Sequence, residues 1–247
     1  DPDLNLYDME RVEVLAGPQG TLYGTGALGG IIRLVPNMPD PSGGAGSASV
    51  GLGTTRKGGT SSDGAAMLNV PIVGDRLAIR AVGYRVIDAG YIDDPLRRQS
   101  NINRSISYGG RLDIRYALGN DWTFDVGGVV QNIASRDGQY TLRGQPDLTR
   151  TTLLAQPFDN DYRLAQFRIA KRWNDMELVS STALVRHDVE TRYDATTAST
   201  GAPPRLFDET IGISLISHET RLSGRRRGTD DWVAGVSVVH DIEQQWR

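Results

Sequence analysis

The sequence predicts an all-β protein, in the form of an antiparallel transmembrane β-barrel, and three observations predict it. From Ser47 onward, apolar and polar residues alternate with the period of two that is typical of strands. The alternating runs reach about 10–14 residues, whereas a globular strand has about 5–6 and a tilted membrane strand needs about 9–11. The connections between these runs are alternately short and long, as in outer-membrane barrels.

Composition excludes several other classes of protein. The chain has 247 residues, a net charge of −3, 29 glycines and no cysteine. The missing cysteines exclude disulfide scaffolds and thiolate catalysis, and the charge balance does not indicate nucleic acid as a partner. No run reaches the roughly 18 apolar residues of a transmembrane helix. Both ends fall within structured-looking sequence, so we expect the chain to be cut from a longer one.

The alternating runs divide charged from apolar side chains. In residues 108–116, Leu112 and Ile114 share one face, opposite Arg111 and Arg115. A soluble sandwich would turn the apolar face inward, and a membrane barrel would turn it outward to lipid. Strand length and loop asymmetry favour the barrel, with Phe124 and Phe167 also facing outward and Arg168 inward.

We predict nine strands in this part of the chain. Their ranges are 44–54, 62–71, 76–88, 104–117, 121–135, 161–173, 175–190, 212–223 and 231–242. The aromatic residues beside the short connections predict an interfacial girdle, formed by Tyr116, Trp122, Trp173 and Trp232. Because bacterial barrels usually have even strand counts, we expect the barrel to continue beyond residue 247.

The first 40 residues differ from the rest. A short strand at 11–15, a glycine-rich turn system at 16–30 and a strand at 31–36 precede a proline- and glycine-rich linker. Such a small element ahead of a barrel pattern predicts a structure packed inside the barrel, where glycines allow close approach to the walls.

The segment "DMERVEVLAGPQGTLYGTGALGGIIRLVPNMP", residues 8–39, resembles the C-terminal part of the plug domain of TonB-dependent outer-membrane receptors. Residues 76–94, 217–224 and 231–241 are similar to early barrel segments of that family. Ala16 stands where many members carry arginine, and Arg33 and Pro36 also depart from the family pattern. These departures leave open how the plug is held.

The resemblance implies part of a plugged barrel of about 22 strands. Residues 1–40 would be plug, 41–46 a linker and 47–247 the N-terminal portion of the barrel. It also implies a Gram-negative outer-membrane location and energised, ligand-gated import, with a ferric siderophore as the expected cargo. The implied partners are a TonB-type energy-transducing inner-membrane protein, outer-membrane lipid and the small-molecule ligand.

Candidate site residues follow from the predicted faces and from this resemblance. Tyr7, Arg80 and Tyr84 are candidate ligand-binding residues. A second set carries charges placed to form ion pairs between plug and wall, and consists of Glu10, Arg11, Arg111, Asp113, Arg115 and Arg168. We expect no catalytic residue, metal site or cofactor, because the three histidines lack ligand spacing and "GTGALGG" (24–30) lacks a phosphate-loop lysine.

Three alternatives remain open from the sequence. The same class of receptor could import cobalamin or an oligosaccharide. A passive porin is a different class, although its lumen needs no glycine-rich plug. A soluble β-rich binding module is the third.

Overall fold

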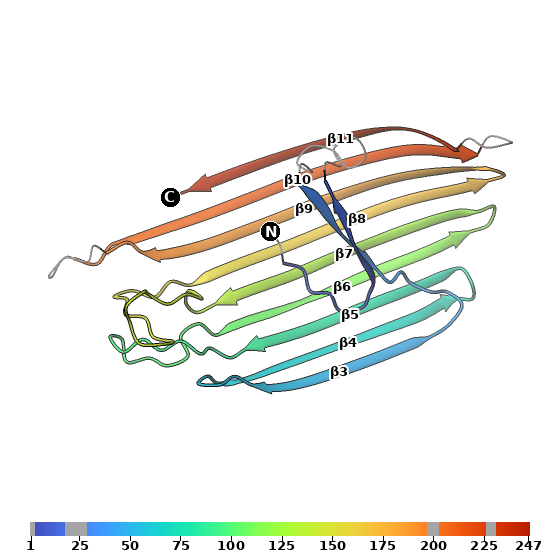
Figure 1. Cartoon of the computed structure of the whole chain (residues 1–247). Helices are drawn as coiled ribbons and strands as arrows, with labels where there is room; N and C mark the ends of the chain where they lie inside the picture. The colour runs from blue at the N-terminus through green and yellow to red at the C-terminus, as the bar shows by residue number, and fades with distance from the viewer. Residues whose placement is uncertain (1–2, 18–28, 197–202, 226–230) are drawn as a thin grey trace.

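The computed structural model describes residues 3–17, 29–196, 203–225 and 231–247, and these form only strands, turns and loops. A two-stranded antiparallel hairpin precedes a nine-stranded antiparallel sheet in which every strand pairs with its sequence neighbours (Figure 1). The hairpin consists of β1 (Met9–Ala16) and β2 (Gly30–Pro36). The sheet consists of β3 (Ala45–Thr54), β4 (Thr60–Val73), β5 (Leu77–Asp88), β6 (Ser105–Leu118), β7 (Trp122–Ser135), β8 (Phe158–Trp173), β9 (Met176–Asp194), β10 (Leu206–Arg225) and β11 (Asp231–Trp246).

All nine predicted strands are confirmed, and several are longer than predicted. β9 continues to Asp194 and β10 begins at Leu206, both beyond the expected ends. The sequence pattern ended early because the outward positions become polar there, whereas the backbone pairing of these two strands continues through Leu206 and Asp194. The predicted glycine turn system lies mostly outside the described residues.

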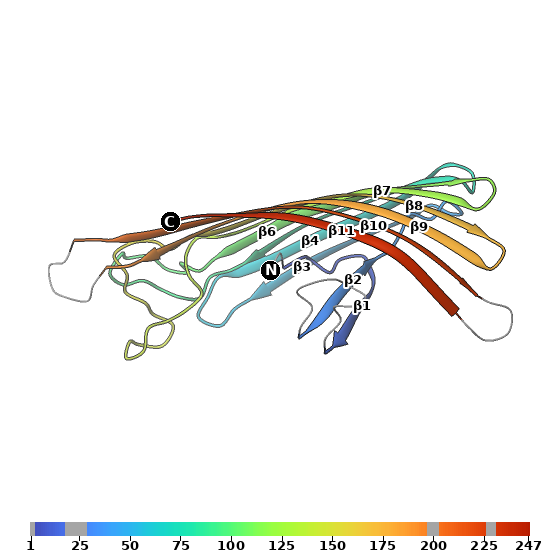
Figure 2. The same ribbon diagram turned by 90° about the horizontal axis from the view of Figure 1, so that it is seen from above.

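The sheet curves around the hairpin, so it has a concave face toward β1–β2 and a convex face away from it (Figure 2). On the convex face Leu112 and Phe167 are 50% and 41% exposed, whereas Arg111 and Asp113 on the concave face are 8% and 2% exposed. The predicted orientation, with apolar side chains outward and charges inward, is therefore confirmed.

The convex apolar band is shorter than the strands. On β8 and β9 the outward positions change from apolar residues such as Leu184 to Asp161, Arg163, Arg186 and Asp188. These charged positions lie toward the ends that carry the long connections, so the strands extend past the apolar band at that end. The part of the chain that the structure describes contains no helix able to cross a membrane.

The connections 74–76, 119–121 and 174–175 are tight turns at one end of the sheet, opposite the long connections 89–104 and 136–157 (Figure 1). Their residues adopt positive φ at Asp75 (52°), Asn120 (64°), Asp121 (60°) and Asn174 (47°). Asn and Asp tolerate this left-handed region better than other non-glycine residues. The predicted turns thus have the residues that tight hairpins need.

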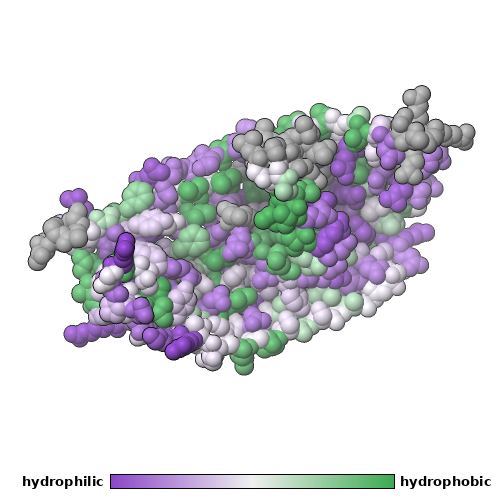
Figure 3. All heavy atoms as spheres, in the orientation of Figure 1, coloured by the Kyte–Doolittle hydropathy of each residue, from purple (hydrophilic) through white to green (hydrophobic). Residues whose placement is uncertain are grey.

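The linker from the hairpin to β3 is fixed to the wall by one side chain. Asn69, which is 1% exposed, donates from Nδ2 to the carbonyl oxygens of Asp40 (2.8 Å) and Gly43 (2.7 Å). Its Oδ1 accepts from the Asp40 amide at 2.9 Å. The space-filling view shows hydrophobic residues gathered over the hairpin and mixed polarity on the concave wall around it (Figure 3).

A new charge should cost much more stability on the convex face of the sheet than on the concave face. Leu112→Arg places a cation within the apolar band and should destabilise the folded barrel by about 2–4 kcal/mol. Ala183→Arg, on the concave face of β9, should cost much less because water reaches that face. Urea unfolding of the intact protein in lipid bilayers measures both. Equal losses for the two variants would contradict the assignment of the faces.

Candidate functional site

The hairpin is attached to the wall through Asp8, the residue immediately before β1. Arg80 of β5 donates from Nε to Oδ2 at 2.8 Å and from Nη2 to Oδ1 at 2.6 Å. Arg111 of β6 donates from Nη2 to Oδ2 at 2.6 Å and to the Asp8 carbonyl at 3.1 Å. The three side chains are 7–10% exposed. Asp8 is therefore a nearly buried carboxylate that binds two strands of the wall.

Backbone geometry presents Asp8 to these arginines. Asp8 has a positive φ of 58°, and its carbonyl also accepts from the Asn37 amide at 3.2 Å. The Asn37 side chain donates to Oδ1 at 3.1 Å, which closes the base of the hairpin. Burial alone would raise the pKa of Asp8, but hydrogen bonds from Arg80 and Asn37 and both arginine charges outweigh it and hold the pKa below 3.8.

The other predicted wall charges pair within the wall. Arg111 Nε lies 3.0 Å from Asp113 Oδ2. Arg115 and Arg168 both contact Asp125, at 2.7 Å and 3.0 Å. These ion pairs fix the arginine side chains on β6 and β8. Among the described contacts of the predicted wall residues, only those of Arg111 also reach the plug.

The described ion pairs of Glu10 and Arg11 lie within the hairpin. Arg11 bonds to Glu10 and Glu13, and Glu13 also binds Arg33 at 3.1 Å. Arg11 and Glu13 are two residues apart on one strand and share a face, and Arg33 is opposite Glu13 in the β1–β2 register. The predicted pairing of Glu10 and Arg11 with the wall stays a prediction.

A second attachment uses amide groups. Gln131 of β7 accepts the Asn5 amide at 3.0 Å and donates to the Asp3 carbonyl at 3.1 Å. The hydroxyl of Tyr84, a candidate ligand residue, donates to the same Gln131 oxygen. The Tyr7 hydroxyl lies 3.4 Å from Ser47 Oγ on β3. Arg80, Tyr84 and Tyr7 therefore all contact groups of the plug segment or of the wall. A simple ligand-binding site would instead leave these side chains open to the ligand.

Residues 3–6 form one side of a hollow of about 740 Å³ on the concave face, toward the long connections. The opposite side comes from β5 to β9, and the end comes from residues 137–140 and Gln156. Its aromatic members are Tyr140, Phe158 and Tyr193. The hollow and the Asp8 attachment are therefore joined by a few residues of the same segment.

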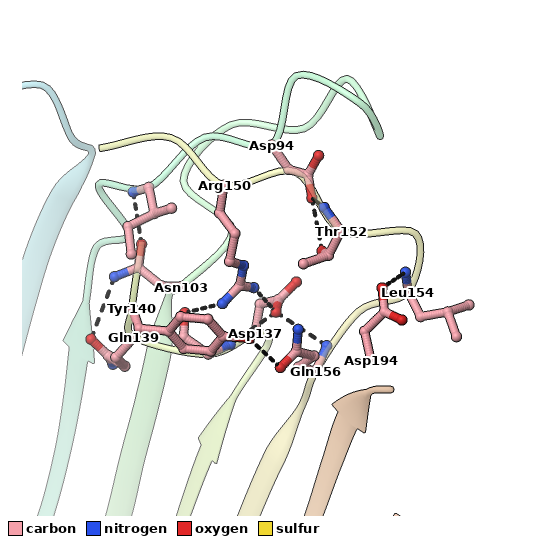
Figure 4. Close-up of polar contacts among 12 residues, drawn as sticks. Asp94, Asn103, Asp137, Gln139, Tyr140, Arg150, Thr152, Leu154, Gln156 and Asp194 are labelled. Carbon is pink, nitrogen blue, oxygen red and sulfur yellow. Dashed lines mark hydrogen bonds and ion pairs between the residues drawn. The ribbon is translucent and has the colours of Figure 1, made fainter. Parts of the chain in front are cut away.

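The two long connections 89–104 and 136–157 are held together beside this hollow (Figure 4). Asp137 accepts from Arg97 and from Arg150, and Arg150 is 0% exposed. The Arg150 guanidinium also donates to the Gly138 carbonyl at 3.1 Å and lies 4.5 Å from the centroid of the Tyr140 ring.

Asp94 completes the contact between the connections. Its carboxylate accepts from Arg97 Nε at 2.8 Å and from the Thr152 hydroxyl at 3.0 Å. Burial would raise the pKa of Asp94, but the hydrogen bonds from Arg97 and Thr152 lower it below its ordinary value. The backbones of Asp93 and Leu148 bond at 2.9 Å. A buried, fully charged network therefore fixes the shape of this end of the hollow.

Sequence reasoning missed Asp8, Gln131 and this loop network. Asp8 is the first residue of the segment that resembles the plug motif, ahead of the predicted strand at 11–15. This position could have marked it as a candidate for contact between plug and wall. Gln131 and Arg150 gave none, because their partners are more than ten residues away in the chain. The described residues contain no cluster of metal ligands.

Comparisons with known proteins support the plug segment and the barrel fold described above. Residues 2–31 match the family model of the TonB-dependent receptor plug domain. This chain carries the plug segment and the barrel fold of a TonB-dependent receptor. The TonB-dependent receptors that this chain resembles are β-barrels of the Gram-negative outer membrane.

Curated relatives match the receptor chain over a short segment. The pesticin receptors of Yersinia pestis and Yersinia enterocolitica are 60% identical to it over 35 residues, which is 14% of this chain and 5% of theirs. The chain therefore matches only a small part of the length of these relatives.

Solved structures share the fold over nearly the whole receptor chain. The ferric yersiniabactin uptake receptor of Yersinia pestis has a TM-score of 0.79 at 18% identity, covering 96% of this chain and 37% of that one. The open form of the ferric-catecholate import receptor of E. coli K12 has a TM-score of 0.75 at 16% identity, covering 96% and 40%. The siderophore receptor PiuA of Acinetobacter baumannii has a TM-score of 0.74 at 12% identity, covering 97% and 36%.

Removing the Asp8 charge should release the plug segment from the wall. Asp8→Asn leaves the nearly buried Arg80 without its anion and Arg111 with Asp113 alone, which should cost about 3–5 kcal/mol. Glu10→Gln, in an exposed pair of the same hairpin, should have little effect. Hydrogen exchange of residues 3–16 in the intact receptor measures the release. Unchanged protection in Asp8→Asn would show that the carboxylate does not hold the segment.

The attachment should also weaken in acid. Because the folded pKa of Asp8 is below 3.8, its stabilising contribution is complete above that pH and is lost as pH falls through the folded pKa. The protection factors of residues 3–16, which compare the measured exchange with the intrinsic rate at each pH, should therefore fall below about pH 3.8 in the wild type. The difference between wild type and Asp8→Asn should shrink over the same range, and a constant difference would contradict the assignment.

Proposed function

We propose that the intact receptor imports a scarce nutrient by energised, ligand-gated transport, with a ferric siderophore as cargo. The observation that carries this proposal is the continuity of residues 3–8, which begin beside the hollow and end in the Asp8 attachment. The choice of cargo is supported by the shared fold of the ferric yersiniabactin uptake receptor, the ferric-catecholate import receptor and the siderophore receptor PiuA.

In this proposal residues 1–40 act as plug, 41–46 as linker and 47–247 as barrel wall. Ligand in the hollow contacts residues 3–6 and disturbs the Gln131 contacts. The Asp8 ion pairs hold the hairpin until a TonB-type inner-membrane partner supplies force. Tyr7 and Tyr84 would contribute through the plug segment and Gln131, and Arg80 through Asp8. Outer-membrane lipid would contact the convex face.

A passive porin fits less well, because ion pairs and amide contacts hold the hairpin against the concave wall. Cobalamin or an oligosaccharide remains an alternative cargo. A soluble binding module is disfavoured by the broad apolar convex face.

A receptor-deleted strain tests the function. Expression of the intact receptor should restore growth on at least one ferric chelate as sole iron source, whereas Asp8→Asn should alter uptake without abolishing ligand binding. A strain that shows no iron-dependent difference with any chelate would remove the siderophore assignment. A large steady conductance of the purified receptor in planar bilayers would favour the porin.

A further inference from the structure

We propose that the ligand surface that meets this wall is aromatic or aliphatic and carries no net negative charge, so that the cargo is a neutral or cationic ferric chelate. This inference rests on the proposed function, since it specifies the ligand of the same hollow. The charges and rings around the hollow carry it.

Apolar and aromatic groups face the hollow from both sides. On the wall, Tyr193 lies beside Phe207 with ring centroids 6.3 Å apart, and the two residues are 47% and 38% exposed. Phe158 lines the hollow from β8, and on the plug side Leu6 is 56% exposed. Exposed rings and aliphatic groups of this kind bind flat or amphipathic ligands through apolar burial.

Three arginines at the hollow or in the connections beside it are already paired with carboxylates. Arg97 and Arg150 are bound by Asp94 and Asp137. Arg192 is the one cationic residue among the described lining residues, and its guanidinium is held by Asp208 at 2.7 Å.

The arginines of the plug attachment are also engaged. Arg80 and Arg111 contact the Asp8 carboxylate deeper on the wall. Using either for a ligand would require breaking the attachment. Among the described residues that line the hollow, no guanidinium is therefore free of a carboxylate partner.

The remaining polar groups of the hollow are acidic or neutral. Asp88 is exposed, lines the hollow and has no ion-pair or hydrogen-bond partner for its side chain in the described parts of the chain. Ser105, Ser107 and Thr191 provide hydroxyls. This set can donate to carbonyl or phenolate oxygens and can attract a cation, but it repels a polyanion.

The lining of the hollow should make the free energy of binding depend on the charge of the ligand. A polyanionic chelate that enters the hollow loses water from its charged groups and gains no compensating cation from this wall, and such uncompensated desolvation is costly. A neutral chelate loses less hydration and gains contact with the rings, and a cationic chelate gains compensation from Asp88 and the ring faces. Complementary charge mainly determines which partner is accepted, so the wall should discriminate by ligand charge.

The test compares two iron probes on the purified intact receptor. One is a neutral ferric tris(hydroxamate) with aliphatic substituents, and the other is a trianionic ferric tris(catecholate). Binding is measured by tryptophan fluorescence, and uptake is measured with radioactive iron in a receptor-deleted strain. We expect the neutral chelate to bind at least about tenfold more tightly, a difference of about 1.4 kcal/mol.

A matched pair of variants changes only the charge of the hollow. Ser107→Lys should tighten binding of the tris(catecholate) by about tenfold, whereas Ser107→Gln, of similar length and uncharged, should leave the ratio of the two affinities unchanged. Equal effects of Lys and Gln would overturn the electrostatic basis of the proposal.

The outcomes separate the inference from the function. Iron uptake through the tris(catecholate) in preference to the neutral chelate would overturn the inference and leave siderophore import standing. Uptake of neither chelate, with no iron-dependent growth on any other, would overturn siderophore import, and the inference would be overturned with it.

Discussion

One carboxylate, Asp8, joins the plug hairpin to the barrel wall, and the arrangement of the concave face depends on it. A nearly buried charge must be paired or it destabilises the fold. Here Arg80 and Arg111 come from adjacent strands, so their spacing is set by the β5–β6 register, in which Arg80 is opposite Asp113 and Val82 opposite Arg111. The wall therefore positions both donors before the plug segment arrives, and the segment needs only to present one side chain.

The same segment connects this attachment to the hollow. Residues 3–6 line the hollow, and Gln131 bonds to their backbone two strands away from Arg80. The opposite end of the hollow is fixed by the paired charges of Asp94, Asp137, Arg97 and Arg150. A segment held by Gln131 and Asp8 thus faces a network of buried ion pairs across the hollow. Pairing of the arginines also leaves the described surface of the hollow neutral or acidic.

The fold was largely predictable because a membrane imposes a simple pattern. Each strand must turn apolar residues to lipid and polar residues to the interior, so Leu112 and Arg111 were assigned to opposite faces from period alone. Asn120 and Asp121 marked a tight turn in the same way. Strand ends at Asp194 and Leu206 were not predictable, since outward residues beyond the apolar band are polar and the alternation disappears while backbone pairing continues.

By itself, the sequence determined the all-β class, the nine strands, the orientation of their faces and the family of the plug segment, because these are encoded by local periodicity and a contiguous motif. Only the tertiary structure decided which charges meet. Asp8 is 72 residues from Arg80 and 103 from Arg111, and the described ion pairs of Arg11 are with Glu10 and Glu13 of its own strand. Ion pairing between distant residues depends on register and backbone geometry, which no local pattern records.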